Sequence, residues 1–485
     1  MHYKNKILTS LLIASGIIST PLSAFANDSS ELEQLRSLVQ ELDQKVRILE
    51  RKGELGEEVA VAEKKAAPVI KADAGRFGLS SADGKNTFNL HALVQADYRA
   101  YDNSSTNATG STDGWLIRKA RTGIDGTLFG WVNYRITPEF AGSGPVLMDA
   151  YVDLNYKPWL KLRAGRYKPF VGLARLQGDS DGKFLEHSFV TGFVPQRDIG
   201  ASIFGDLFGG KLSYALGYNN GTPDGSGTEY PSSEPGGNGK EVTGRLFAQP
   251  FKGEDHVLAG LGFGFAGTTI THAGSQTSTQ LSAYKAFGQS NFFSYSAASA
   301  AGVTPATTAT VADGERTRWT PQLYYYYGPF GLMTEYVHET QGVTRSTNHK
   351  VLSNDAWQAT FSYVLTGEDA SYGTVNPKQA FSPNSGGWGA WEVVARVNGV
   401  SFDDNAFIGT SATRLADISK SAKSATAYGA GINWYINNYT RFGFDYEHTE
   451  FEGGGVGSTA NAVGITKLVN KKDENTVIGR LQVAF

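Results

Sequence analysis

Apolar and polar residues alternate with a period of two along most of this chain after its first 87 residues. The pattern is clear in the last ten residues, where Val477, Leu481 and Phe485 share one face of an extended strand. Arg480 and Gln482 lie on the other face, because successive side chains of a strand point in opposite directions. A strand that is apolar on one side and ends on an aromatic residue is typical of a transmembrane β-barrel, which must close without a sheet edge.

The same alternation predicts strands throughout the rest of the chain. Residues 147–157, for example, place apolar side chains on one face and Asp149 and Asp153 on the other. An apolar outer face and a charged inner face are expected of barrel strands. We therefore predict an all-β fold, a 16-stranded antiparallel transmembrane β-barrel, with strands near 88–101, 115–128, 131–141, 147–157, 160–168, 198–207, 211–219, 240–249, 254–266, 316–327, 330–341, 353–365, 388–399, 424–436, 438–450 and 475–485.

The connections between these strands alternate between short and long. A soluble β-sandwich would also alternate in its strands, but its loops would not differ by side, whereas barrels have short periplasmic turns and longer external loops. Residues 366–387 are an exception, because this long connection falls on the turn side. Aromatic residues mark the turn side and predict an interfacial girdle: Phe129, Trp131, Trp159, Phe208, Phe251, Phe330, Trp434 and Tyr435.

The first 26 residues predict a secretory signal peptide. Lys4 and Lys6 precede an apolar run from Ile7 to Ile18, and Ala24-Phe-Ala26 is a cleavage site. A membrane anchor is the alternative, but the apolar run is too short to span a bilayer. We expect export through the periplasm to the bacterial outer membrane.

Residues 27–53 predict a short periplasmic coiled coil, which Gly53 would end. A seam of apolar residues repeats with the 3-4 spacing of three heptads, and a single amphipathic helix lying on another surface is the alternative. Residues 54–87 are expected to form a linker, and the barrel would occupy residues 88–485. The seam residues are Leu32, Leu35, Val39, Leu42, Val46 and Leu49.

Composition adds two constraints. Mean hydropathy is −0.29, a value that barrels share with soluble proteins because lipid-facing and lumen-facing residues cancel. The chain has no cysteine, which excludes disulfides and thiolate metal sites. The net charge of −3 does not predict ion preference, because a few charges at the narrowest point set selectivity.

Several segments resemble the phosphate-selective porin O/P family. They include Arg118-Lys-Ala-Arg-Thr-Gly-Ile-Asp-Gly-Thr-Leu-Phe129, Leu162-Arg-Ala-Gly-Arg-Tyr-Lys-Pro-Phe-Val-Gly-Leu173 and Val194-Pro-Gln-Arg-Asp-Ile-Gly200. The resemblance covers about residues 88–485. It implies a sixteen-stranded barrel, usually a homotrimer, that passes phosphate or other small anions. It also implies that the third external loop, 169–197, and the long turn, 366–387, enter the lumen.

The resemblance also implies a basic site on the second strand, Arg118 and Lys119, with Lys183 from the third loop. Residues 267–315 depart from the family, because they contain no arginine and only Lys285 as a basic residue, so we expect a less selective, anion-leaning pore. Rings of arginine and lysine favour anions, although charges in the lumen can also simply pair across strands. The candidate constriction residues are Arg118, Lys119, Arg121, Arg135, Arg163, Lys183 and Arg197.

The sequence predicts no enzyme: no H-x-x-x-H pair occurs, and the G-x-S-x-G match at Gly178-Asp-Ser-Asp-Gly182 lies inside the long connection 169–197 and not between a predicted strand and a helix. We expect neither cofactor, metal nor nucleic acid. The expected partners are outer-membrane lipid, other copies of the chain, small anions such as phosphate and the barrel-assembly machinery, for which Phe485 would be the signal. An unselective diffusion pore, or an envelope tether that binds peptidoglycan through residues 30–52, are the alternative functions.

Overall fold

The computed structural model describes residues 29–73, 76–102, 112–142, 144–221, 239–300 and 306–485. The predicted signal peptide, residues 1–26, lies outside these ranges. The described chain divides into two compact units, one ending at Ala67 and one running from Pro68 to Phe485.

The described part of the first unit is the helix α1 (Ser29–Ala66). The prediction that the helix ends at Gly53 and that a linker follows is wrong, because α1 continues for another thirteen residues. Glutamate, alanine and lysine in this stretch favour a helix strongly enough to absorb Gly53 and Gly56, and the helix stops just before Pro68, which disfavours helical backbone in the preceding residue.

The seam side chains of α1 are exposed in the single chain, with Leu35 68% and Leu49 67% accessible. The coiled coil therefore stays a prediction. Within the described ranges no helix has the length and apolar character needed to cross a membrane.

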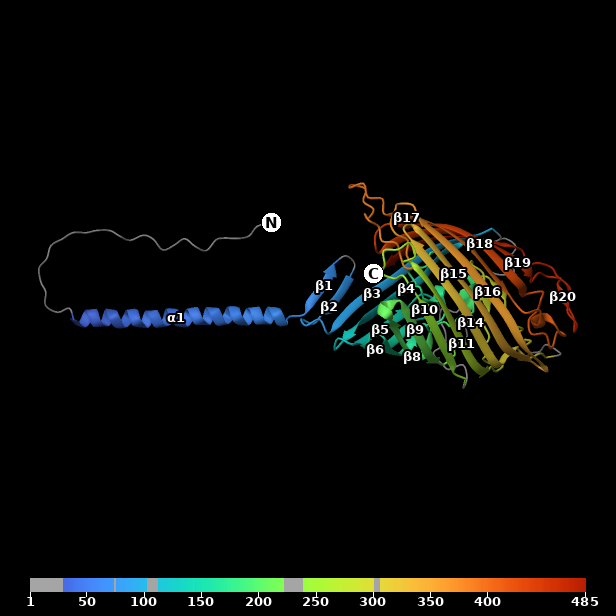
Figure 1. The fold of residues 1–485 in the computed structure, drawn as a ribbon, viewed down its shortest axis with the longest axis horizontal. Coiled ribbons are helices and arrows are strands. Elements are labelled where there is room, and N and C mark those ends of the chain that lie inside the picture. The colour runs from blue at the N-terminus through green and yellow to red at the C-terminus, as the bar shows by residue number, and fades with distance from the viewer. Residues whose placement is uncertain (1–28, 74–75, 103–111, 143, 222–238, 301–305) are drawn as a thin grey trace. The chain divides into compact units, whose positions relative to one another are not determined.

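The second unit is a closed antiparallel β-barrel of sixteen strands within the described residues (Figure 1). Each strand pairs with the next, and the last pairs with the first through Ala484 beside Leu93 and Thr476 beside Tyr101. The strands are β3 (Thr87–Tyr101), β4 (Gly114–Leu128), β5 (Val132–Glu139), β6 (Val146–Lys157), β7 (Leu160–Tyr167), β8 (Asp198–Leu207), β9 (Leu212–Asn219), β10 (Glu241–Ala248), β11 (Leu261–Ala273), β14 (Val311–Tyr327), β15 (Phe330–Arg345), β16 (Asn348–Val364), β17 (Ala390–Ser401), β18 (Ala422–Tyr435), β19 (Thr440–Gly453) and β22 (Glu474–Ala484).

Part of the expected linker is also a sheet. β1 (Val69–Asp73) and β2 (Arg76–Ser80) pair with each other, and β2 adds to β3 over Thr87–Leu90, beyond the point where β22 ends. The phenyl ring of Phe77 in β2 packs edge-on against that of Phe485, with 5.6 Å between ring centres. β2 therefore lies beside the start of the closing seam.

Two strand predictions need correction. The strand predicted at 254–266 is β11 at Leu261–Ala273, because the turn that precedes it runs from residue 249 to residue 260 and contains the apolar Val257 and Leu258. The external connection between β15 and β16 is a tight turn at residues 346–347, where Ser346 has a φ of 55°.

The outer face carries aromatic residues at both ends of the barrel. We call the end with short turns the turn end and the opposite end the loop end. Exposed aromatics at the turn end, such as Trp131 and Phe208, confirm the predicted girdle, but Tyr435 is only 2% exposed and faces the interior. A second, unpredicted set surrounds the loop end: Tyr98, Trp115, Trp319, Trp357, Tyr428 and Tyr446.

Loops fill the loop-end half of the interior with an apolar core. It combines loop three (residues 168–197), which contains α2 (Leu173–Leu176) and η1 (Phe189–Gly192), with side chains from residues 281–295 and 402–418. The rings of Phe293 and Phe402 stack at 3.7 Å in this core. The remaining short elements are η2 (Phe208–Gly210), β12 (Tyr284–Lys285), β13 (Asn291–Phe293), η3 (Asp404–Phe407), β20 (Thr459–Ala460) and β21 (Ile465–Lys467).

The long turn on the turn side, residues 365–389, meets loop three inside the barrel. Gln177 Nε2 donates to the carbonyl of Tyr372 at 2.8 Å, and the Tyr372 ring stacks on Tyr324 of β14 at 5.4 Å. Both segments thus enter the lumen, as the family resemblance implies.

Candidate pore constriction

A β-bulge in β4 turns two consecutive basic residues toward the lumen. Gln95 pairs with Lys119 and the next residue, Ala96, pairs with Ile117, so Arg118 is the extra residue. In a regular strand, one of Arg118 and Lys119 would point toward the lipid. A β-bulge changes the direction of a side chain and leaves one residue without a partner on the neighbouring strand. Both side chains consequently contact loop three.

Arg118 belongs to a cluster around Glu186 of loop three, which we call the Glu186 cluster. Arg118 Nε and Nη2 donate to the two carboxylate oxygens at 2.6 and 3.0 Å. Arg99 of β3 and Arg480 of β22 donate to Oε1 at 2.6 and 3.1 Å, and both also donate to Asp97. Three arginines therefore hold one loop carboxylate across the seam where the barrel closes.

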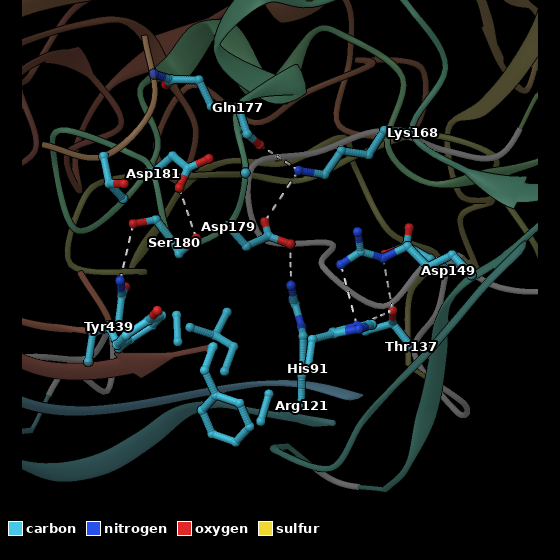
Figure 2. Close-up of a pocket in the computed structure, with 18 of the residues that line it drawn as sticks. His91, Arg121, Thr137, Asp149, Lys168, Gln177, Asp179, Ser180, Asp181 and Tyr439 are labelled. Carbon is cyan, nitrogen blue, oxygen red and sulfur yellow. Dashed lines mark hydrogen bonds and ion pairs between the residues drawn. The ribbon is translucent and has the colours of Figure 1, made fainter. Parts of the chain in front are cut away.

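Loop three carries a second carboxylate surrounded by cations, the Asp179 cluster. Arg121 of β4 pairs with Asp179, Arg197 Nη2 donates to it at 2.7 Å, and the ammonium groups of Lys168 and Lys119 lie 3.4 and 3.6 Å away. Arg121 also pairs with Glu139 at 2.6 Å. Figure 2 shows Asp179 between Lys168 and Arg121.

These surroundings keep both loop carboxylates ionised. Burial alone would raise the pKa of Glu186 and of Asp179. The guanidiniums around Glu186, and the lysines and arginines around Asp179, outweigh burial and hold each pKa well below its usual range. Burial lowers the pKa of Lys168 to about 8, although Asp179 partly opposes it.

A row of three side chains fixes the segment between these clusters. Gln95 of β3, Gln482 of β22 and Arg441 of β19 are neighbours across adjacent strands. They donate in turn to the carbonyls of Asp179, Ser180 and Gly182, at 3.2, 3.1 and 2.8 Å. Loop three therefore lies along the wall in a fixed register.

Lys183 anchors loop three to β17 and to the inserted turn. Its ammonium lies 3.0 Å from Glu392 of β17 and donates to the carbonyl of Gly373 at 3.0 Å. Burial lowers the pKa of Lys183, and the negative charge of Glu392 partly offsets this decrease. Lys183 thus links loop three to the inserted turn and does not face the cavity described next.

A cavity of about 610 Å³ lies below loop three at the turn end. Its wall includes more cations than carboxylates, and its lining reaches Phe485 and the turn before β19. Figure 2 shows part of the lining, including His91, Thr137, Asp149 and Asp181. The charged lining residues are Arg121, Arg135, Arg163, Lys168, Arg197, Arg441, Asp149, Asp179 and Asp181.

The seven predicted constriction residues all face the interior, but they do not form one site. Arg118 joins the Glu186 cluster, Lys119, Arg121 and Arg197 join the Asp179 cluster, and Lys183 lies apart. Arg163 binds Asp153 through two nitrogens at 2.7 and 2.8 Å and lies 4.0 Å from the Tyr151 ring. Arg135 lines the cavity.

Sequence reasoning did not show which carboxylates would pair with these cations. Asp179 and Glu186 are ordinary loop residues in sequence, and only their folded position shows their role. Arg441, Gln482 and Arg480 were detectable as inward-facing polar positions of the last two strands. Among residues with described positions, no group of three or more histidine or acidic side chains is arranged to hold a metal ion.

Comparison with known proteins gives a consistent family. The sequence model of the family described as "Phosphate-selective porin O and P" matches residues 88–485. Porin O of Pseudomonas aeruginosa is 22% identical over 397 residues, which cover 78% of this chain and 86% of that protein.

Solved structures of outer-membrane proteins are also similar to this chain, at low identity. The outer membrane channel DcaP of Acinetobacter baumannii is 13% identical with a TM-score of 0.48, covering 86% of this chain and all of that one. An anion-selective porin from Comamonas acidovorans is 14% identical with a TM-score of 0.46, covering 82% of this chain and all of that one.

Proposed function

Because this chain belongs to the phosphate-selective porin O and P family, it is an outer-membrane diffusion channel, and we propose that the channel favours small anions. The family and the barrel assign it to transport rather than catalysis. The proposed preference for anions over cations is moderate, because the interior carries both basic and acidic side chains.

The charge of the turn-end cavity carries this proposal. Six arginine and lysine side chains line it, against three aspartates. A channel wall with excess positive charge lowers the energy of a passing anion and raises that of a cation, more strongly in a narrow space than in open water. An unselective pore would instead require that the remaining positive charge be screened at physiological salt.

High affinity for phosphate is not part of the proposal. Residues 267–315 contain no arginine, and the cations of the Asp179 and Glu186 clusters already hold carboxylates of loop three. A solute phosphate would have to displace those carboxylates to use the same donors. We expect phosphate to permeate and to block chloride current only weakly.

We also propose that the protein self-associates as a homotrimer through α1. The heptad seam of α1 is exposed in one chain, and burying exposed leucines and valines against other copies is favourable. Barrels that already associate would raise the local concentration of α1 and help so short a coil to form. An envelope tether through the same helix is the other role compatible with an exposed seam.

Conductance measurements on purified protein in a planar bilayer test the channel. The expected result is a stepwise rise in conductance, with a zero-current potential in a KCl gradient that has the sign of chloride permeation. Protein that inserts and never conducts would contradict the assignment as a pore.

A further inference from the structure

Two arginines in the wall of the turn-end cavity have no carboxylate partner. Arg135 of β5 donates to Thr137 Oγ1 at 3.3 Å and lies 3.4 Å from His91 Nε2. Arg441 of β19 donates to the carbonyl of Gly182 at 2.8 Å and to Gln482 Oε1 at 3.5 Å. Within the described chain, neither guanidinium forms an ion pair at 4.0 Å or less.

The other arginines of the same cavity are already neutralised. Arg121 pairs with Glu139, Arg163 with Asp153, and Arg197 with Asp149. The uncompensated positive charge of the wall is therefore concentrated at two positions that the family resemblance does not single out. Neither position lies in the Asp179 or Glu186 cluster.

Arg441 supplies a second observation that indicates a ligand. Its residue is only 4% exposed, and its Nε atom is buried with no hydrogen-bond partner among the residues the structure places. A buried cation without a counter-ion is unfavourable, and an anion from solution can supply the missing charge and acceptor. The same residue lines both the turn-end cavity and the small cavity beside Glu186.

We propose that Arg135 and Arg441 form the solute anion site of this pore, at the turn-end side of loop three. The inference rests on the proposed anion-leaning channel and identifies where its solutes bind. The ligands are small inorganic anions of chloride to phosphate size, since a guanidinium offers a donor fork that suits an oxyanion.

Nearby carboxylates keep this site weak enough for transport. Asp181 lines the same cavity, and its Oδ1 accepts a hydrogen bond from Ser180 Oγ at 2.9 Å, not from a cation. Asp149 and Asp179 also line the cavity. A conducting site must release its ion as readily as it takes it up, and these negative groups oppose long residence.

The test compares single-channel currents of the full-length protein and its variants in chloride, with inorganic phosphate as the competing ion. The variants are Arg135→Gln, Arg441→Gln and the double substitution. Arg441→Lys keeps the charge, and Lys161→Gln is the matched control, because it removes one inward-facing charge from β7 that already pairs with Asp206 at 3.0 Å and does not line the cavity.

We expect the double variant to reduce the chloride-to-potassium permeability ratio at least threefold and to weaken phosphate block by a similar factor. Arg441→Lys should stay within twofold of wild type, as should Lys161→Gln. If Arg441→Gln does not assemble, Arg135→Gln must still reduce the ratio. Unchanged ratio and block in assembled Arg135→Gln and double variants would overturn the proposed site, whereas a wild-type channel without anion preference would overturn the proposed function itself.

Discussion

Arg118 of β4 holds the Glu186 carboxylate of loop three in a two-bond fork, at 2.6 and 3.0 Å. The Glu186 carboxylate thus occupies the position beside Arg118 where the family resemblance implies that a solute anion binds. The same is true of Asp179 among Arg121, Arg197 and the two lysines. The pore therefore carries its own counter-ions at its most basic positions.

Replacing Glu186 with Gln should increase anion preference. The change keeps the shape of the side chain and removes the negative charge that Arg99, Arg118 and Arg480 share, while Arg99 and Arg480 keep their pairing with Asp97. Removing one partner of a buried ion pair costs about 3–5 kcal/mol, so the folded oligomer should also melt at a lower temperature. Zero-current potentials and heat denaturation on gels measure the two effects. An unchanged zero-current potential would show that these arginines do not reach the conduction path.

Lys168 predicts a pH dependence of selectivity. Its pKa is about 8, so its charge is lost as the pH rises from 7 to 9, and the anion preference should fall in that window. In the unfolded chain Lys168 keeps its proton up to the ordinary pKa of 10.5, whereas in the folded protein it loses the proton at about 8. The contribution of Lys168 to the free energy of unfolding therefore increases as the pH rises between these two pKa values.

Lys168→Gln should remove the change between pH 7 and pH 9, and Lys168→Arg should keep the anion preference at both. An equal pH response in wild type and Lys168→Gln would assign the titration to another group. Asp179 and Glu186 should stay ionised as the pH falls from 7 to about 5, because their pKa values lie well below the usual range, so they add no change of selectivity in that window.

Phe485 should matter for assembly. Its backbone exchanges hydrogen bonds with Ala92 at 3.0 and 2.8 Å, and its ring packs on Phe77. Phe485→Asp removes the ring and places a charge at the end of the closing strand. We expect less than half of the wild-type amount of heat-resistant protein in the outer membrane.

Phe77→Ala separates packing from signalling, because it removes only the ring contact. If it lowers assembly as much as Phe485→Asp, the contact with β2 explains the effect. Wild-type assembly of Phe485→Asp would show that the terminal aromatic is not the assembly signal.

The seam of α1 should stabilise oligomers without affecting conduction. Leu42→Asp places a charge in the seam, whereas Gln44→Asp adds the same charge outside it. Crosslinking should detect fewer oligomers for Leu42→Asp only, and deletion of residues 27–67 should leave single-pore conductance unchanged. Equal oligomer yields for both variants would leave α1 with a tethering role.

Much of the barrel was predictable because apolar and polar residues alternate with a period of two in each strand. The strand expected at 198–207 is β8 with the same bounds. The error at β11 arose where apolar residues of a long turn imitated a strand, and the error at 54–66 arose because helix-favouring residues outweighed two glycines.

The candidate site was predictable only in part. Inward-facing cations follow from alternation, but the bulge at Arg118 depends on how β3 and β4 pair, which the local sequence does not specify. The pairing of Lys183 with Glu392, more than 200 residues away in the chain, depends on the path of loop three. Long-range contacts of this kind determine which cations are neutralised and which, like Arg441, are not.

The anion preference of the wild-type channel can be measured as its zero-current potential in a KCl gradient. We expect a potential with the sign of chloride permeation, moderate in size, largest at low salt where screening is weakest, and only weakly changed by millimolar phosphate. A potential with the sign of potassium permeation would contradict this expectation, and block by micromolar phosphate would contradict the weak anion site described here.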